Sequence, residues 1–526
     1  MNFIYRPAVL ILLLGVVFLA SACSTPGQPL APDRMLGQKR ARDSSPEAKA
    51  FSENVAAEMQ KNNPPSAPIE TPPKIKNISE IKDPAWKAIR AKKVDTSRPL
   101  ALIELLDMAL RNNPKTRQAW ENTRVARAKE KQSESKLYPQ VNVSETITRE
   151  KSDANIPGND IDDYYYGPTA KLTYLLFNFG GRGFAIKETV EMVLSADAQY
   201  DQAIQDLVLG VEQSYYGLYS SQAALKAAQD DTKNAKDDYD AAQEKFAVGL
   251  TSKLDALQAQ SNYQDSLYKL EQAKGGLESA KASLAQVIGV AADTAFEIAE
   301  PSDNLPAGVT KEDASLLIEE SLEKRPDIAG LKAEWRSKKA AAHAATTDLL
   351  PSLSLGGQAS KNNYKYYGVH KASEEDHGYA GYAQVSWNVF DGFYNLNKKR
   401  QADRERDIAF ERLIEGELAL SADVWTKYYS FSTAQNKLVF SESFLASAQE
   451  SYDLALESYK AGLKSMLDLT QAQAQLSQAR SRLIQSRQDV FVALAQLAHS
   501  TGTLSVKDYG LKINNMDTEE GKDNDR

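Results

Sequence analysis

Two long stretches of the chain carry apolar and small residues at steps of three and four positions. They cover about 211–246 and 424–459, and the spacing is sustained over several heptads in each. This spacing is typical of long helices that pack along a shared seam. A continuous helix over 181–248 would be about 100 Å long at 1.5 Å per residue. A compact globular domain does not need a helix of this length.

Four shorter stretches alternate between apolar and polar residues instead, at about 139–149, 168–178, 351–361 and 379–390. A period of two predicts β-strands, and half-polar strands of about ten residues are typical of transmembrane barrels. In the second stretch, Leu175 and Phe177 weaken the alternation. An ordinary soluble β-hairpin is the alternative. Tyrosines gather beside the connecting loops, as they do at membrane–water interfaces; they are Tyr164, Tyr165, Tyr166, Tyr364, Tyr366, Tyr367, Tyr379 and Tyr382.

A sequence motif occurs once after each long heptad stretch. FAVGLTSKLDALQAQ at 246–260 returns 213 residues later as YKAGLKSMLDLTQAQ at 459–473, and eight of the twelve positions from Gly249 to Gln260 are identical. Each copy contains a helix end, a glycine turn and an N-cap for a new helix. We therefore predict two helical hairpin tips. The shared residues beyond the turn indicate that the tip surface itself is used.

The same shift relates much of the chain, so we predict two tandem copies of one unit. Tyr215-Tyr216 matches Tyr428-Tyr429, and Gly289 matches Gly502. The predicted organisation is a signal peptide at 1–22, a lipidated, Pro-rich disordered tether at 23–98, a first repeat at 99–289 with its tip at 246–252, a linker at 290–313, a second repeat at 314–502 with its tip at 459–465, and a polar tail at 503–526.

The front of the chain predicts export and a lipid anchor. The only long apolar run, 8–22, follows Arg6 and ends in small residues, as secretory signal peptides do. The single cysteine, Cys23, comes directly after it. The segment LASAC resembles a bacterial lipobox, in which this cysteine becomes the lipidated first residue of the mature chain. A chance cysteine in a cleaved segment is the alternative.

Composition argues against several other classes of protein. The formal net charge is −8 and the charges are spread along the chain, so no basic patch predicts nucleic-acid binding. The four histidines are scattered without metal-ligand spacing, and no glycine-rich phosphate loop follows a strand. We therefore expect neither an enzyme, nor a bound metal, nor a cofactor.

The order helix, two strands, long helix, tip and long helix, duplicated behind a signal peptide, resembles the TolC family of outer-membrane factors. The resemblance implies a mainly α fold with a β-barrel part. It also implies a homotrimer in which each chain gives four strands to one twelve-stranded barrel above a helical periplasmic tunnel. One departure is Asn178, where the family's FDxG motif has aspartate. The residues that carry the resemblance are Phe177-Asn178-Phe179-Gly180, Phe390-Asp391-Gly392, Val248-Gly249-Leu250, Asp255, the Ala-Gln pairs at 259–260 and 472–473, Gly289 and Gly502.

This resemblance implies a passive channel in the outer membrane of a Gram-negative bacterium, in contact with its lipid. The channel would be the exit of a tripartite efflux pump, opened at its periplasmic tips by an adaptor protein. The adaptor would connect it to an inner-membrane pump of the resistance-nodulation-division or ABC type. One alternative is the outer-membrane component of a type I protein secretion system. Another is a periplasmic coiled-coil structural lipoprotein.

The resemblance also implies roles at the two tips. Asp255, Tyr459 and Lys464 match the family's gate-locking carboxylate, tyrosine and basic residue. Asp468 matches an acidic ring at the pore constriction, whose second acidic position is Gln471 here. The alternative is that Asp255 and Asp468 are early-helix acids favoured by the helix dipole, and that Lys464 is solvated. The expected docking points for the adaptor are Gly249, Leu250, Gly462 and Leu463.

Overall fold

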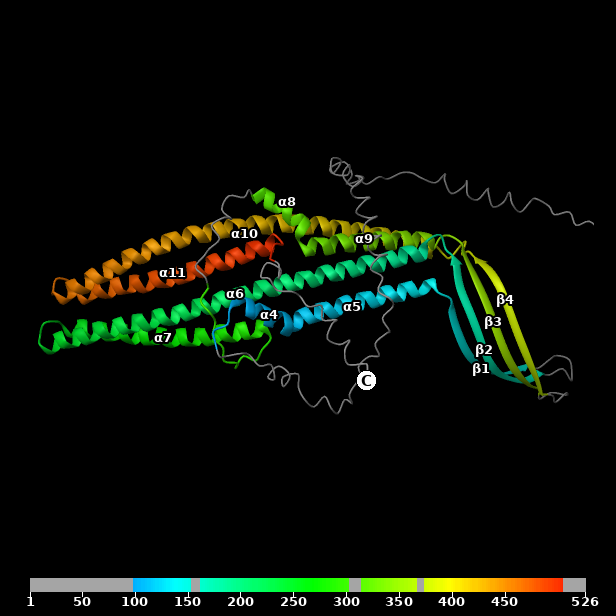
Figure 1. Ribbon diagram of the computed structural model, residues 1–526, viewed down its shortest axis with the longest axis horizontal. Helices are drawn as coiled ribbons and strands as arrows, with labels where there is room; N and C mark the ends of the chain where they lie inside the picture. The colour runs from blue at the N-terminus through cyan, green and yellow to red at the C-terminus, as the bar shows by residue number, and fades with distance from the viewer. Residues whose placement is uncertain (1–97, 153–160, 302–313, 367–372, 505–526) are drawn as a thin grey trace, which may run out of the picture. The chain divides into compact units, whose positions relative to one another are not determined.

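The computed structural model describes residues 98–152, 161–301, 314–366 and 373–504. The predicted signal peptide, Cys23, the tether and nearly all of the predicted tail lie outside these residues. The first repeat contains α4 (Leu102–Asn112), α5 (Pro114–Glu134), a 3₁₀ turn (Ser135–Leu137), β1 (Gln140–Ser152), β2 (Ile161–Phe177), α6 (Gly181–Ala247) and α7 (Lys253–Ile288). The second contains α8 (Ala314–Lys324), α9 (Pro326–Thr347), β3 (Ser352–Tyr366), β4 (Ser373–Ser386), α10 (Tyr394–Lys460) and α11 (Met466–Ser500) (Figure 1).

The duplicated helix–strand–strand–helix–helix unit is therefore confirmed, as is the mainly α fold with four strands. The two long helices, α6 and α10, each have 67 residues. They run in the same direction, from the strands to the hairpin tips (Figure 1). Helix α6 packs against α5, α9, α7 and α11, whereas α10 packs against α8, α9 and α11. Among the described residues, no helix is at once long enough and apolar enough to span a membrane.

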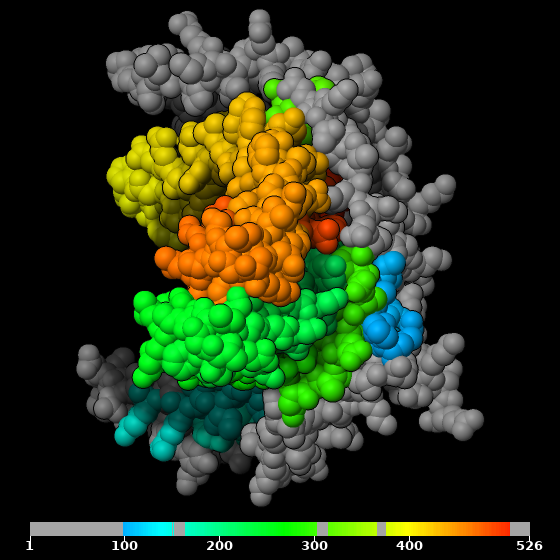
Figure 2. All heavy atoms as spheres, turned by 90° about the vertical axis from the view of Figure 1, so that its left-hand side faces the viewer, coloured from blue at the N-terminus to red at the C-terminus, as the bar shows by residue number. Residues whose placement is uncertain are grey.

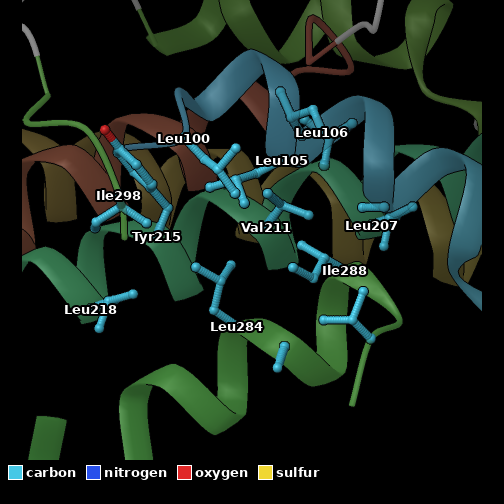
Figure 3. Packing of buried hydrophobic residues seen from close by; sticks show 14 of the residues in the cluster. Leu100, Leu105, Leu106, Leu207, Val211, Tyr215, Leu218, Leu284, Ile288 and Ile298 are labelled. Carbon is cyan, nitrogen blue, oxygen red and sulfur yellow. The ribbon is translucent and has the colours of Figure 1, made fainter. Parts of the chain in front are cut away.

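The largest apolar cluster lies where the short helix α4 meets α6 and α7 (Figure 3). Leu105 and Leu106 point from α4 toward Val211 of α6 and Ile288 of α7, and all four are almost completely buried. The predicted linker contributes as well. Leu100 forms a parallel bridge with Ile298, and the Tyr215 hydroxyl donates a hydrogen bond to the Ala299 carbonyl at 2.7 Å. The described part of the linker is thus held against the helices.

The four strands form one antiparallel sheet in the order β1-β2-β3-β4. The pairing of β2 with β3 joins the two repeats. The sheet register also places the alternating residues of all four strands on common faces. Val143 lies opposite Ala170, Ala170 opposite Ala359, and Ala359 opposite Tyr379. The other face carries polar side chains such as Asn142, Lys171 and Gln358 at the adjacent positions.

The apolar face is open. Val141, Val143 and Ile147 are about two-thirds exposed, and Tyr379 is 93% exposed. The weak alternation in the second strand has a structural cause, because the β2–β3 register shifts between Leu175 and Phe177. This bulge brings Phe177 opposite Leu353, on the apolar face.

Several strand bounds differ from the expected ones, and at the loop ends the strands are longer: β1 ends at Ser152, β3 ends at Tyr366 and β4 begins at Ser373. Strand β2 begins at Ile161 rather than near 168, since its ladder with β1 continues into the tyrosine segment. Strand β4 ends at Ser386 rather than near 390. Its last pair is Ser352 with Ser386, and the residue before Ser352 is Pro351, which has no N–H to extend the ladder.

Each strand-to-helix junction uses two successive residues with positive φ. They are Phe179 and Gly180 before α6, and Gly392 and Phe393 before α10. The preceding polar side chain satisfies the helix start in both cases. Asn178 Oδ1 accepts from the Arg182 N–H at 3.4 Å, and Asp391 Oδ2 accepts from the Asn395 N–H at 3.0 Å. The neutral amide of Asn178 therefore caps the start of α6 in the way that the carboxylate of Asp391 caps the start of α10.

Candidate functional site at the hairpin tips

The two tips have the same local structure. Gly249 and Gly462 have φ of 78° and 77°, a conformation that glycine adopts without steric cost. Each following helix begins with a reciprocal capping box. In the first, the Asp255 N–H donates to Ser252 Oγ at 3.2 Å, and Asp255 Oδ2 accepts from Ser252 Oγ at 2.9 Å. In the second, Asp468 Oδ2 accepts from Ser465 Oγ at 2.8 Å.

These caps set the charge state of both carboxylates. Hydrogen bonds from Thr251 and Ser252 lower the pKa of Asp255 below its ordinary value. Hydrogen bonds from Ser465 lower the pKa of Asp468, and the nearby charge of Lys464 acts in the same direction. Both acids are therefore ionised at neutral pH.

Above the tips, the two hairpins meet along what we call the seam. The seam is built around the apolar cluster of Ala242, Ala259, Tyr452, Tyr459, Met466, Leu469, Ala472 and Leu476. The α10–α11 hairpin supplies all of the large buried side chains, whereas the α6–α7 hairpin supplies two buried alanines and the partly buried Tyr239, which packs against the cluster. Figure 2 looks at the tip ends and shows the two hairpins in contact, α10–α11 in orange and α6–α7 in green.

Polar links also join the hairpins across the seam. Arg480 of α11 forms an ion pair with Asp231 of α6 at 2.6 Å, and both side chains are less than one-fifth exposed. The Arg480 guanidinium also donates to Gln449 Oε1 at 3.3 Å. On α7, the Asn262 amide donates to Thr470 Oγ1 of α11 at 2.7 Å.

A third link lies at the end of the long helices. Lys245 Nζ of α6 is 4.2 Å from the centroid of the Tyr459 ring. It also donates a hydrogen bond to the Tyr459 carbonyl, in the last turn of α10. A cation at this place interacts favourably with both the aromatic ring and the carbonyl end of the helix.

The residues predicted for the gate lie on both sides of the seam. Lys464, Asp468 and Gln471 line one hollow of about 290 Å³ on the α10–α11 hairpin. Tyr459 is buried, and its pKa is raised mainly by that burial and further by the negative charges of Asp255 and Asp238.

No ion pair joins Asp255 to Lys464 within the described part of the chain. The assignment of these gate residues stays a prediction.

The predicted docking residues lie at the outermost turns. Leu250 is 76% exposed and Leu463 is 79% exposed. Leu254 and Leu467, four residues further along each copy, are also exposed. Each tip therefore presents two leucines to solvent.

The sequence did not predict the links made by Asp231 and Lys245, or the burial of Asp238 between them. These three charged residues follow one another at intervals of seven, beside the small residues of the seam. Charges at strict heptad spacing next to an apolar stripe were the available signal. Their partners lie more than 200 residues away in sequence, and nothing local identifies them.

Comparison with known proteins gives consistent results. The family described as outer membrane efflux protein matches residues 105–290 and 317–503. The pyoverdine export outer membrane protein OpmQ of Pseudomonas aeruginosa is 26% identical over 387 residues, covering 70% of this chain and 76% of that protein. Protein CyaE of Bordetella pertussis is 26% identical over 336 residues, covering 64% of this chain and 70% of that protein.

Solved structures share the fold. The outer-membrane channel OprN superposes with a TM-score of 0.68 at 19% identity, covering 76% of this chain and 90% of that one. The CmeC outer membrane channel of Campylobacter jejuni gives a TM-score of 0.67 at 17% identity, covering 80% and 92%. At these identities the likeness concerns the fold alone.

Proposed function

Because the chain belongs to the outer membrane efflux protein family, we propose that it is the outer-membrane exit channel of a tripartite efflux pump. The family and the fold are those of channel proteins. One observation carries the proposal: a sheet with one open apolar face and one polar face continues directly into long helices. An apolar face suits lipid and a polar face suits a water-filled lumen. A periplasmic coiled-coil lipoprotein has no use for such a sheet.

A single chain cannot complete this channel. Strands β1 and β4 are the two edges of the sheet, and their outer backbone groups have no strand partner in the described part of the chain. Open sheet edges are not tolerated in lipid, so further copies must pair with both edges. We propose a homotrimer with a twelve-stranded barrel. A row of exposed apolar residues along α10 supports contact with a neighbouring copy; it consists of Leu418, Trp425, Tyr429, Phe440 and Leu454.

In this trimer, the tips would form the periplasmic gate. Asp255 and Lys464 are not paired within one chain, so their link would form between neighbouring copies. An exposed pair of this kind contributes about 0–1 kcal/mol, which an adaptor could displace. The exposed residues Leu250 and Leu463, with Gly249 and Gly462, would receive that adaptor. Three Asp468 carboxylates around a narrow lumen would favour cations, as charged rings do in other pores.

The proposal also includes the class of cargo and a lipid anchor. OpmQ is named for pyoverdine export, and TtgC of Pseudomonas putida is named as a probable efflux pump protein. We propose a small molecule as the cargo of this chain as well. Type I protein secretion is the second candidate. Export assays with the inner-membrane pump that works with this channel would distinguish the two. Cys23 would carry the lipid, so Cys23→Ala would abolish incorporation of labelled palmitate.

The proposal is tested with the full-length protein in a planar lipid bilayer. We expect a trimeric mass in detergent and a small conductance that rises in the double variant Asp255→Ala with Lys464→Ala. Asp468→Ala should weaken block by trivalent cations.

The matched control is Asp265→Ala with Lys269→Ala. This double variant removes one carboxylate and one ammonium from an exposed pair on α7, away from the tip. A stable monomer, or a complete lack of conductance, would contradict the channel. An unchanged conductance in the tip variant would contradict the gate alone.

A further inference from the structure

Asp238 is a carboxylate buried in the seam between the two hairpins. It lies on α6, nine residues before the helix ends, and is 3% exposed. Its Oδ2 atom is buried and has no hydrogen-bond partner among the described residues. A buried polar atom without a partner is costly, and an ionised carboxylate in such a place is costlier still.

The charged and polar groups that act on Asp238 lie on α6 and α10, and residues of α7 and α11 act on its tyrosine neighbours. On α10, the Tyr452 hydroxyl and the positive charge of Lys460 both lower the pKa of the carboxyl group. The negative charge of Asp237 on α6 raises the pKa of Asp238, and that of Asp453 on α10 raises the pKa of Tyr452. Further away, the charge of Asp255 on α7 raises the pKa of Tyr459, and the charge of Arg480 on α11 lowers the pKa of Tyr452.

Burial has the largest effect on the pKa of Asp238. It raises the pKa of Asp238 to about 7, and Asp237 adds to the rise, while Lys460 and Tyr452 oppose it. The ordinary value of such a group is 3.8. Tyr452 and Tyr459 are themselves buried, and burial raises the pKa of both, so neither hydroxyl supplies a charge at neutral pH.

We propose that Asp238 is a proton-sensitive latch, which holds the two hairpins of each chain together when it is protonated and loosens them when it is ionised. This inference rests on the proposed function, in which the hairpin tips form the periplasmic gate, and it adds that the two hairpins of each chain part when the gate opens. A protonated carboxyl group can lie in the apolar seam beside Tyr452 and Tyr459 without carrying a charge. An ionised one gains by meeting water, which requires the hairpins to part.

The direction of the pH effect follows from proton uptake. Between about pH 4 and pH 7 the closed seam binds a proton that the opened seam releases, because only the opened seam exposes the carboxyl group to water. Acidification in this window therefore favours the closed seam, and a rise in pH favours the open one. The open-to-closed ratio changes by at most about tenfold per pH unit for each carboxyl group. The effect levels off above about pH 7.

The test records the open probability of the full-length channel in planar bilayers from pH 5 to pH 8. We expect the ratio of open to closed channel to rise at least tenfold between pH 5 and pH 7. Asp238→Asn, which keeps the size and removes the titration, should stay closed and change less than about twofold over the same range. Tyr452→Phe should move the midpoint to higher pH, because the hydroxyl group that lowers the pKa of Asp238 is lost.

Asp237→Asn is the matched control, since it removes the same charge from the neighbouring exposed position. It should keep a clear pH dependence, with the midpoint moved to lower pH, because the Asp237 charge that adds to the rise in the pKa of Asp238 is lost. Asp238→Asn with an unaltered pH profile would overturn the latch.

Amide hydrogen exchange at the seam ends of α6 and α10 provides a second readout that needs no conducting channel. Faster exchange at pH 7 than at pH 5, after correction for the intrinsic rate, is expected in the unaltered protein and not in Asp238→Asn. Equal protection at both values would overturn the latch. A total absence of conductance in the bilayer would contradict the proposed function instead.

Discussion

The two hairpins share a turn and differ in how they meet the seam. Both tips have a glycine with positive φ, an Asp–Ser capping box and exposed leucines. At matching positions behind the turn, however, the α6–α7 hairpin has Lys253 and Ala256, and the α10–α11 hairpin has Met466 and Leu469. Both residues of the second pair are almost completely buried.

This difference makes the seam asymmetric. One copy of the repeat supplies large apolar side chains, and the other supplies alanines that leave room for them, together with Asp231, Asp238 and Lys245. Two identical copies could not fill one seam in this way, because large residues would clash and small ones would leave cavities. The two hairpins therefore share a turn but have complementary surfaces at the seam.

The largest expected effect comes from removing this complementarity. Leu469→Ala gives the second hairpin the residue that the first carries at Ala256. The cavity left in the seam should destabilise the packed hairpins by about 2–4 kcal/mol. Amide hydrogen exchange in α11 would measure the loss. Leu467→Ala, two residues away on the exposed side, is the matched control and should cost less than about 0.5 kcal/mol. Equal losses in both variants would mean that the seam is not packed.

A smaller effect is expected from the ion pair that crosses the seam. Arg480→Met leaves the mostly buried Asp231 carboxylate without its partner and should cost about 1–3 kcal/mol. Adding Asp231→Asn removes the unpaired charge, so the double variant should recover part of the loss.

The control is Lys274→Met, which breaks an exposed pair with Glu271 on α7 and should change stability by less than about 0.5 kcal/mol. Thermal unfolding of the purified protein would compare the variants. A double variant that loses the full sum of both single changes would argue against coupling between the two residues.

The smallest effect should be the same in both hairpins. Ser252→Ala and Ser465→Ala each remove the side chain that caps the following helix, at a cost of about 1 kcal/mol. Exchange of the first amides of α7 and α11 would report the fraying. Equal losses would show that the turns are equivalent and that the difference lies in the seam. A loss confined to one tip would place part of the difference in the turn itself.

Much of the fold could be predicted from local patterns. The heptads of 211–246 and 424–459 became single helices, because a period near 3.6 has one structural solution over such a length. The hairpin tips followed from glycine and Ser/Thr at fixed spacing. The strand bounds were less well predicted, since the β2 ladder continues past the apolar alternation and β4 stops where Pro351 ends its partner's ladder.

The candidate site was predicted only in part. Sequence comparison of the two tips pointed to the outer turns, where Asp255 and Asp468 form their caps. It did not predict that Lys245 would be the cation beside Tyr459, because that contact joins residues 214 positions apart. It also did not distinguish Asp238 from the exposed Asp237 next to it.

The sequence by itself determined the elements, the duplication and the two turns, since each depends on residues that are neighbours along the chain. Only the tertiary structure decided which residues meet across the seam and which face of α6 is buried there. The physical reason is that a heptad defines a stripe on a helix but not the axial register between two stripes. A shift of one turn would pair Asp238 and Lys245 with other residues, and the register is set by how Ala242 and Ala259 accommodate the large side chains of the other hairpin.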